Sequence, residues 1–250
     1  MIRPAFSWLR LPLPALAFGV LSIVAMSVGA SEFSVSPIGI ELKPGALNET
    51  ISVTNHASAR LRVGMRLMEW TQDAQGADVY KDTGDLVYFP RQMEIAPEAK
   101  RLVRVGAKSV AGESERAYRL FIEEQPEAAT GPERSQVSFY LRFSVPVFIP
   151  PAVRRPQVEV GEPQLAQGKV SLTVRNRGNQ HVRIVRMLVQ DEAGEAREAT
   201  GWYQLPGIDR TYSVEIPQAT CRTAKTLRIT VEGEGLKAVR DLHVDPARCL

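Results

Sequence analysis

A strict alternation of apolar and mostly polar side chains runs from Val137 to Val147. Every second residue of this stretch is apolar, and the residues between them are Ser138, Tyr140, Arg142, Ser144 and Pro146. The period of two is held for longer than an average strand needs. It therefore predicts a long β-strand with one apolar face, ended by Pro150-Pro151, which cannot continue a ladder of hydrogen bonds.

Two interpretations of this strand are open. It is either a half-buried strand of an ordinary β-sandwich, or a strand kept partly uncovered for a partner. The alternation by itself favours the ordinary buried strand.

The first 30 residues have the features of a targeting segment. Arg3 and Arg10 precede an apolar run from Leu11 to Val28, and Val28-Gly-Ala30 is a small-residue cleavage site. We expect a signal peptide over residues 1–30, cleaved near Ala30; the alternative is a single membrane anchor, because the run approaches the length of a span. No later stretch is apolar enough to cross a bilayer, so we expect no stable membrane insertion of the mature chain.

The mature chain would keep 250 − 30 = 220 residues, which is enough for two ordinary domains. Removing two arginines lowers the formal charge from +3 to +1. A nearly neutral protein is a poor nucleic-acid binder by bulk electrostatics, so we expect no nucleic-acid partner.

Short alternating stretches separated by turn residues recur along the whole mature chain, without long helical periodicity. This pattern predicts an all-β protein of antiparallel sandwiches. The stiff segment from Ile149-Pro150-Pro151 to Pro156 is the best linker. We therefore expect an immunoglobulin-like domain at 31–149, a linker at 150–156 and a second such domain at 157–250.

The sequence offers little catalytic chemistry. Its only histidines, His56, His181 and His243, do not stand at metal-ligand spacing with one another. There is no Gly-x-Ser-x-Gly elbow and no phosphate-binding glycine loop. We expect no enzyme, no catalytic residue, no metal and no cofactor.

Cys221 and Cys249 are the only cysteines. In an exported protein they are expected to form one disulfide inside the second domain, and the alternative is two free thiols. Closing a loop of this size would contribute roughly 3–4 kcal/mol in the chain-entropy model.

Several segments, in order and spacing, resemble the PapD-like periplasmic chaperones of pilus assembly. The resemblance covers nearly all of the mature chain, and it rests on residues 33–37, 51–55, 95–104, 118–126, 137–151 and 176–182.

The resemblance implies two immunoglobulin-like domains set at an angle, and a chaperone that caps pilus, fimbrial or coat subunits in the periplasm. Each subunit lacks the last strand of its own sandwich, and the chaperone's last first-domain strand fills that groove. The complex then goes to an outer-membrane usher without nucleotide. The alternative function is a secreted two-domain adhesive or scaffold protein, in which the alternating strand is simply core.

The sequence departs from the better-known branch of the family. In that branch, a basic residue of the first strand and a late lysine of the donor strand hold the subunit's terminal carboxylate. The matching places, Ile38-Gly39-Ile40 and Ser144-Val145, have no basic residue. The Tyr118-Arg119-Leu120 and Ser144–Phe148 segments instead resemble the divergent, archaic branch.

The donor surface is expected in the early part of the alternating strand, where Val137, Phe139, Leu141 and Phe143 share one face. A plain hairpin across the loop 125–136 would pair Ile122 with Phe139, Leu120 with Leu141, and Tyr118 with Phe143.

The same count places Arg119 opposite or diagonal to Arg142. Like charges across a ladder call for an anion between them, and a subunit carboxylate would serve. Arg119 and Arg142 are therefore the expected anchor. The alternative is that one arginine pairs with Glu123 or Glu69 and the other is solvated.

Overall fold

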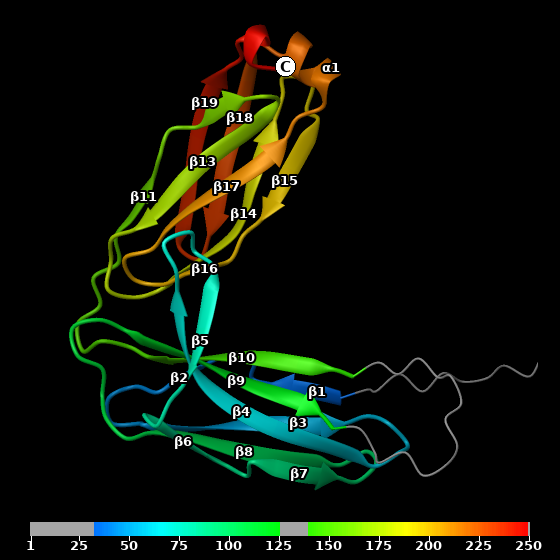
Figure 1. Cartoon of the computed structure of the whole chain (residues 1–250), viewed down its shortest axis with the longest axis vertical. Coiled ribbons are helices and arrows are strands. Elements are labelled where there is room, and N and C mark those ends of the chain that lie inside the picture. Colours follow the sequence, from blue (N-terminus) through cyan, green and yellow to red (C-terminus); the bar gives the residue numbers. More distant parts are fainter. Residues whose placement is uncertain (1–32, 126–139, 250) are drawn as a thin grey trace, which may run out of the picture. The chain divides into compact units, whose positions relative to one another are not determined.

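The computed structural model describes residues 33–125 and 140–249. They form two β-sandwiches, each built of two sheets around its own hydrophobic core (Figure 1). The only helices in this part of the chain are α1 (Gln218–Thr223) and the 3₁₀ helix η1 (Pro246–Cys249). The predicted all-β fold is confirmed.

The first sandwich contains a four-stranded and a six-stranded sheet. The four-stranded sheet has the order β1 (Phe33–Ser36), β3 (Asn48–Asn55), β8 (Lys100–Ala107) and β6 (Leu86–Phe89). The other has the order β2 (Ile40–Glu41), β10 (Arg142–Ile149), β9 (Arg116–Glu124), β4 (Leu61–Gln72) and β5 (Asp78–Asp82), with β7 (Gln92–Ile95) also on β4. Alternate residues of both sheets, such as Ile51, Val103 and Ile122, are fully buried between them.

The second sandwich follows the same plan. One sheet has the order β11 (Val158–Val160), β13 (Lys169–Asn176) and β12 (Gln164–Ala166), with β17 (Asp209–Glu215) on β13. The other has the order β15 (Ala196–Thr200), β14 (Val182–Gln190), β18 (Thr226–Gly233) and β19 (Leu236–His243), with β16 (Tyr203–Gln204) on β14.

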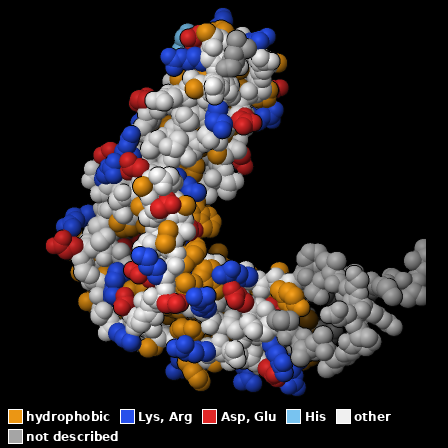
Figure 2. Space-filling view, viewed as in Figure 1, with side chains coloured by type: hydrophobic (Ala, Val, Ile, Leu, Met, Phe, Trp, Pro, Cys, Tyr) orange, Lys and Arg blue, Asp and Glu red, His pale blue; other side chains and the backbone are white. Residues whose placement is uncertain are grey.

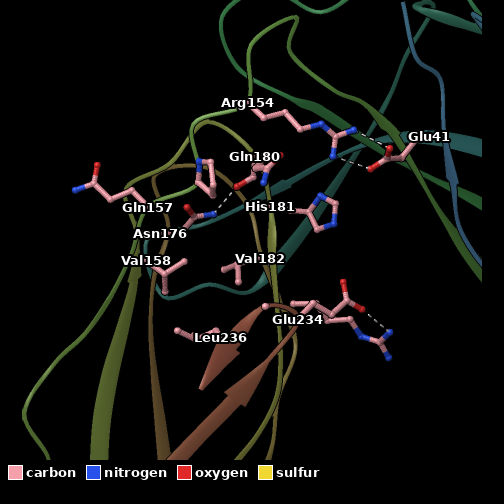
Figure 3. Close-up of a pocket in the computed structure, with 13 residues that line it drawn as sticks. Glu41, Arg154, Gln157, Val158, Asn176, Gln180, His181, Val182, Glu234 and Leu236 are labelled. Atoms are coloured by element: carbon pink, nitrogen blue, oxygen red, sulfur yellow. Dashed lines mark hydrogen bonds and ion pairs between the residues drawn. The ribbon is translucent and has the colours of Figure 1, made fainter. Parts of the chain in front are cut away.

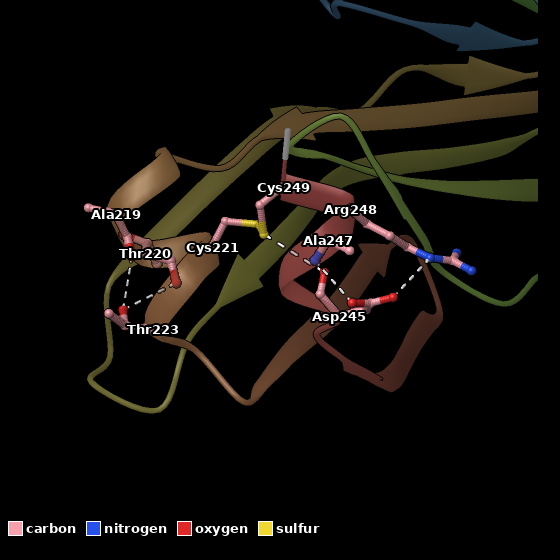
Figure 4. Close-up of a disulfide and its surroundings, with 8 residues drawn as sticks. All are labelled: Ala219, Thr220, Cys221, Thr223, Asp245, Ala247, Arg248 and Cys249. Atoms are coloured by element: carbon pink, nitrogen blue, oxygen red, sulfur yellow. Dashed lines mark hydrogen bonds and ion pairs between the residues drawn. A yellow bond between two sulfur atoms is a disulfide. The ribbon is translucent and has the colours of Figure 1, made fainter.

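The second domain is closed by the predicted disulfide. Cys221 in α1 and Cys249 in η1 are bonded, with their Cα atoms 5.9 Å apart (Figure 4). Both residues are buried in the core of this domain. The disulfide ties the end of the chain to a helix 28 residues earlier, as the sequence predicts.

The predicted hairpin register between β9 and β10 is wrong by four residues. Ile122 pairs with Phe143, and Leu120 pairs with Val145. An even slip keeps the apolar face of a strand inward, so the alternation determined which face is buried but not the pairing. Within the described residues β10 begins at Arg142, and residues 137–139, where the expected strand begins, lie outside them.

The two sandwiches share a small third cluster of buried side chains. Trp70 of β4 and Phe148 of β10 lie on the outer face of the six-stranded sheet and pack with Leu205 of the second domain. The backbone N–H of Leu205 also donates to the Gln72 side chain at 2.9 Å. The outer face of β4, β9 and β10 is therefore partly covered.

Acidic and basic side chains are interspersed over the visible face of both domains (Figure 2). Such a mixed surface agrees with the near-neutral charge of the mature sequence.

No helix within residues 33–125 and 140–249 has the length and apolar composition needed to cross a bilayer.

Candidate functional site

One edge of β10 is largely open. Along the β9 edge every residue from Arg142 to Ile149 has a partner, whereas β2 pairs with Val147 and Phe148 alone. No other strand of the described ranges pairs with β10. Along its amino-terminal half, β10 therefore has backbone groups on one side that no strand of residues 33–125 or 140–249 bonds.

Hydrogen bonds of the flanking residues identify those groups. The Glu124 N–H donates to the Leu141 carbonyl, and the Leu42 N–H donates to the Phe148 carbonyl from the other side. Alternate residues of an antiparallel strand turn their backbone groups to opposite sides. Arg142 and Ser144 therefore turn their backbone groups away from β9, toward the open edge.

The backbone groups of Pro146 point to the same side of β10 as those of Ser144. Its missing N–H would have pointed to the open edge, so proline breaks no bond of the β9–β10 ladder. The close approach of β2 also begins here: a Cβ on Gly39 would lie 3.3 Å from the Pro146 ring, which explains why a glycine fits at this position.

Apolar side chains become exposed toward the open end of β10. The strand is buried from Val145 to Ile149, but Phe143 is only half-buried and stacks edge-on against Phe33 at 4.9 Å. Leu141 is 39% exposed and Tyr140 is 54% exposed. Of the expected donor residues, Leu141 and Phe143 thus lie at the open edge, whereas Val137 and Phe139 lie outside the described residues.

Arg119 lies one strand away from this edge, opposite Pro146 and on the outer face of β9. It is 3% exposed, and its guanidinium carbon lies 3.8 Å from the centre of the Trp70 ring. The same carbon lies 5.3 Å from the ring centre of Trp202 and 5.3 Å from that of Tyr203, and both of these rings belong to the second domain. We call these three rings the aromatic cage.

The guanidinium of Arg119 has few polar partners. Nη1 donates a long bond of 3.4 Å to the Ser144 carbonyl, whereas Nε and Nη2 are buried and have no hydrogen-bond partner among the residues that the structure describes. No ion pair among the described residues includes Arg119, and burial lowers its pKa. The guanidinium still stays protonated at neutral pH, so the cage holds a desolvated cation with free donors.

Arg142 has a different environment. Its Nε bonds Glu123 at 2.8 Å, and its guanidinium lies over Phe121 at 4.1 Å. Both members of this ion pair are well exposed.

The expected placement of the two arginines opposite or diagonal to each other is therefore wrong. Arg119 faces Pro146, and Arg142 faces Glu123, both on the same side of the sheet. The Glu123 pair is the alternative foreseen for one arginine, but the other is buried by aromatic rings rather than solvated. No finding tests an anchor role for either residue, and it stays a prediction.

The aromatic cage is not among the features that the sequence predicts. Trp202 is also held across the two domains, because its indole N–H donates to both carboxylate oxygens of Asp78 at 3.2 and 3.1 Å. The available signal was in β9 itself, where Phe121 interrupts the polar face that Arg119 shares.

A polar cavity of about 420 Å³ lies where β2 and the linker meet the start of β14 (Figure 3). Its charged lining is already paired: Arg154 bonds Glu41 at 2.8 Å, and Arg183 bonds Glu234 at 3.3 Å. The His181 ring stacks on Phe148 with centroids 3.8 Å apart. These contacts connect the domains and leave no free charge for a ligand.

Among the residues that the structure describes, no group of three or more His, Cys, Asp or Glu side chains is placed to hold a metal ion.

Known proteins agree with this architecture. Residues 32–154 match the family model described as the pili and flagellar-assembly chaperone, PapD N-terminal domain. A comparison with curated protein sequences finds no match.

Solved structures match over most of the chain. The CsuC–CsuE chaperone–tip subunit pre-assembly complex, from the archaic chaperone–usher Csu pili of Acinetobacter baumannii, matches at 18% identity with a TM-score of 0.61, covering 84% of this chain and 98% of that chain. The Pseudomonas aeruginosa CupB2 chaperone matches at 14% identity with a TM-score of 0.51, covering 85% and 100%.

The Salmonella enterica SafA pilin–SafB chaperone complex matches at 11% identity with a TM-score of 0.53, covering 86% and 97%. At such low identities, these structural matches show a shared two-domain fold and nothing more. Residues 32–154 therefore belong to the PapD N-terminal domain family of pilus-assembly chaperones, and the chain as a whole shares the fold of such chaperones.

Proposed function

We propose that this protein is a periplasmic chaperone that stabilises pilus, fimbrial or coat subunits by donor-strand complementation and delivers them to an outer-membrane usher. The observation that carries the proposal is the open edge of β10, where unpaired backbone groups coincide with exposed apolar side chains. An incomplete subunit sandwich needs both: hydrogen bonds for its unpaired strands and apolar side chains for its exposed core.

The division of β10 suits this role. Its second half, from Val145 onward, is buried and fixes the strand in its own sandwich. Its first half carries Phe143, which is half-buried against the core of the first sandwich, and the exposed Leu141 lies just before the strand. These are the apolar side chains that we assign to a partner's groove. A subunit strand pairing there would replace solvent at the open edge.

Arg119 is the better candidate for the subunit's carboxylate anchor. Its Nη1 already reaches the carbonyl of Ser144 on the open edge, and two further donors, Nε and Nη2, have no partner in the described part of the chain. A terminal carboxylate accepts such donors in a fork geometry, and the low-polarity cage would strengthen the bond. Arg142 is the weaker candidate because Glu123 already neutralises it.

The usher needs a surface that a bound subunit leaves free. Val87, Phe89 and Leu102 are all more than half exposed on β6 and β8. These strands belong to the four-stranded sheet, whereas the donor edge belongs to the other sheet. We assign this apolar patch to usher docking. A folded Phe89→Asp variant should capture subunits normally but lose usher binding, and unchanged usher binding would refute the assignment.

Co-expression tests the chaperone function. A strand-rich pilus subunit whose gene lies near that of this protein is exported alone and together with this protein. When both are present, gel filtration should show a one-to-one complex. A subunit that is equally soluble and abundant alone would contradict the proposal and favour the secreted scaffold.

Substitution and amidation test the anchor. Arg119→Ala should weaken capture of a subunit with a free carboxyl terminus, whereas Arg142→Ala should have a smaller effect. Amidating the subunit terminus should weaken capture by the wild type and change capture by Arg119→Ala little. Unchanged capture by both folded variants, and by their combination, would exclude these arginines as the anchor.

A further inference from the structure

We propose that the indole of Trp202 is a gate over Arg119, held closed by Asp78, which admits only a carboxylate that arrives on a docked subunit strand. This inference rests on the proposed anchor role of Arg119.

A gate is needed because the aromatic cage covers the guanidinium of Arg119. Arg119 is 3% exposed, and its Nε and Nη2 atoms are shielded from solvent. A carboxylate must approach these nitrogens to about 2.7–2.9 Å to form charge-assisted bonds. At least one ring of the aromatic cage must therefore move before the anchor can bind anything.

The three rings differ in how firmly they are held. Trp70 is 1% exposed, in the middle of the sheet between β9 and β5. Tyr203 belongs to β16 and packs edge-on against Trp70 at 5.6 Å. Trp202 is 39% exposed and lies between β15 and β16, outside any strand. Its displacement uncovers the least apolar surface, so Trp202 is the ring that moves.

Asp78 holds this ring in its closed position by a hydrogen bond. Its carboxylate accepts the indole N–H of Trp202, and it is itself held by the side chains of Gln72 at 3.0 Å and Tyr80 at 3.1 Å. The acceptor is thus fixed to the first domain, whereas the ring belongs to the second. Breaking a single donor's contact with Asp78 frees the gate.

The gate gives the anchor selectivity. A free small anion gains only its bond to Arg119, which must offset both the lost indole bond and the displaced ring. A carboxylate carried by a strand that already pairs with β10 has the additional binding free energy of that strand. We therefore expect the closed gate to exclude acetate and to admit a docked subunit terminus.

The test compares two opened variants with a matched control. Asp78→Ala removes the acceptor, and Trp202→Phe keeps a ring but removes the indole N–H. Asp82→Ala is the control, because Asp82 is an exposed acid of the same strand β5 whose ion pair is with Arg66. Stopped-flow association with a free-carboxyl subunit is measured for each, beside the same subunit amidated.

Both opened variants should associate about 3- to 10-fold faster than wild type and Asp82→Ala, and the gain should vanish with the amidated subunit. In addition, 50 mM acetate, roughly the concentration at which a millimolar affinity saturates, should slow subunit association in the opened variants only.

Folded variants that associate at the wild-type rate, or more slowly, overturn the gate. If amidation still weakens wild-type capture in that case, the anchor stands without a gate. If instead Arg119→Ala captures normally and amidation has no effect, both the anchor and its gate are refuted, while the one-to-one complex can persist. Should Asp78→Ala not fold, Trp202→Phe decides.

Discussion

A proline at Ser144 should disable the donor edge without unfolding the protein. The Ser144 N–H points away from β9, so Ser144→Pro removes no bond of the β9–β10 ladder. Pro146, two residues later, also turns its backbone away from β9, which shows that the strand accepts proline on this side. Phe143, the preceding residue, is in a strand, as the residue before proline prefers.

The size of the effect follows from one missing donor. A subunit strand paired along the open edge would keep a buried carbonyl opposite Ser144 without its N–H partner. Leaving such a group unsatisfied costs about 1–3 kcal/mol. The dissociation constant of the complex should therefore rise about 5- to 150-fold.

Two further variants make the measurement specific. Ser144→Ala removes the hydroxyl but keeps the N–H, and should bind subunit like the wild type. Val145→Pro removes an N–H that faces β9, and should destabilise the first domain itself. Folding is followed by circular dichroism and complex formation by titration. If Ser144→Pro is folded and binds as tightly as Ser144→Ala, pairing along this edge is not how subunits are held.

Three other outcomes test the framework around the site. Reducing the Cys221–Cys249 disulfide reopens a loop of 28 residues and should lower the stability of the second domain by about 3.5 kcal/mol, seen as a lower urea midpoint; an unchanged midpoint would contradict it. Gly201→Ala should destabilise the same domain by several °C in thermal unfolding, because its Cβ would clash with the Ile184 carbonyl of β14; full stability would show that the loop can move aside. The hydrogen bond from Arg154 holds the pKa of Glu41 below its ordinary value of 4.5, so this contact stabilises the fold above that pH and is lost as pH falls through the lowered pKa. The stability difference between wild type and Arg154→Gln, measured against pH, should shrink below pH 4.5, and a difference that grows there would refute the sign.

The sequence predicts the fold well because each sandwich strand reports its buried face locally. Alternation in β9 and β10 places Leu120, Ile122 and Val145 inward, as the structure shows. It cannot fix pairing, since every even slip buries the same residues. The observed four-residue slip moved Arg142 from the neighbourhood of Arg119 to a partner of opposite charge, Glu123. Site geometry thus changed while the core did not.

The aromatic cage was beyond local inference for a different reason. Trp70 lies on β4, the strand next to β9, whereas Trp202 comes from the loop before β16 and Tyr203 from β16 itself. Only the contact of the two domains brings the second pair of rings to Arg119. One local signal was present: in β9, Phe121 is 5% exposed although it shares the outer face with Arg119. A strand with apolar residues on both faces must be covered on both sides. An arginine on such a face is then a buried cation that needs a partner. Within residues 33–125 and 140–249, Arg119 finds only rings and one long carbonyl bond, which is why we assign its remaining donors to an incoming carboxylate.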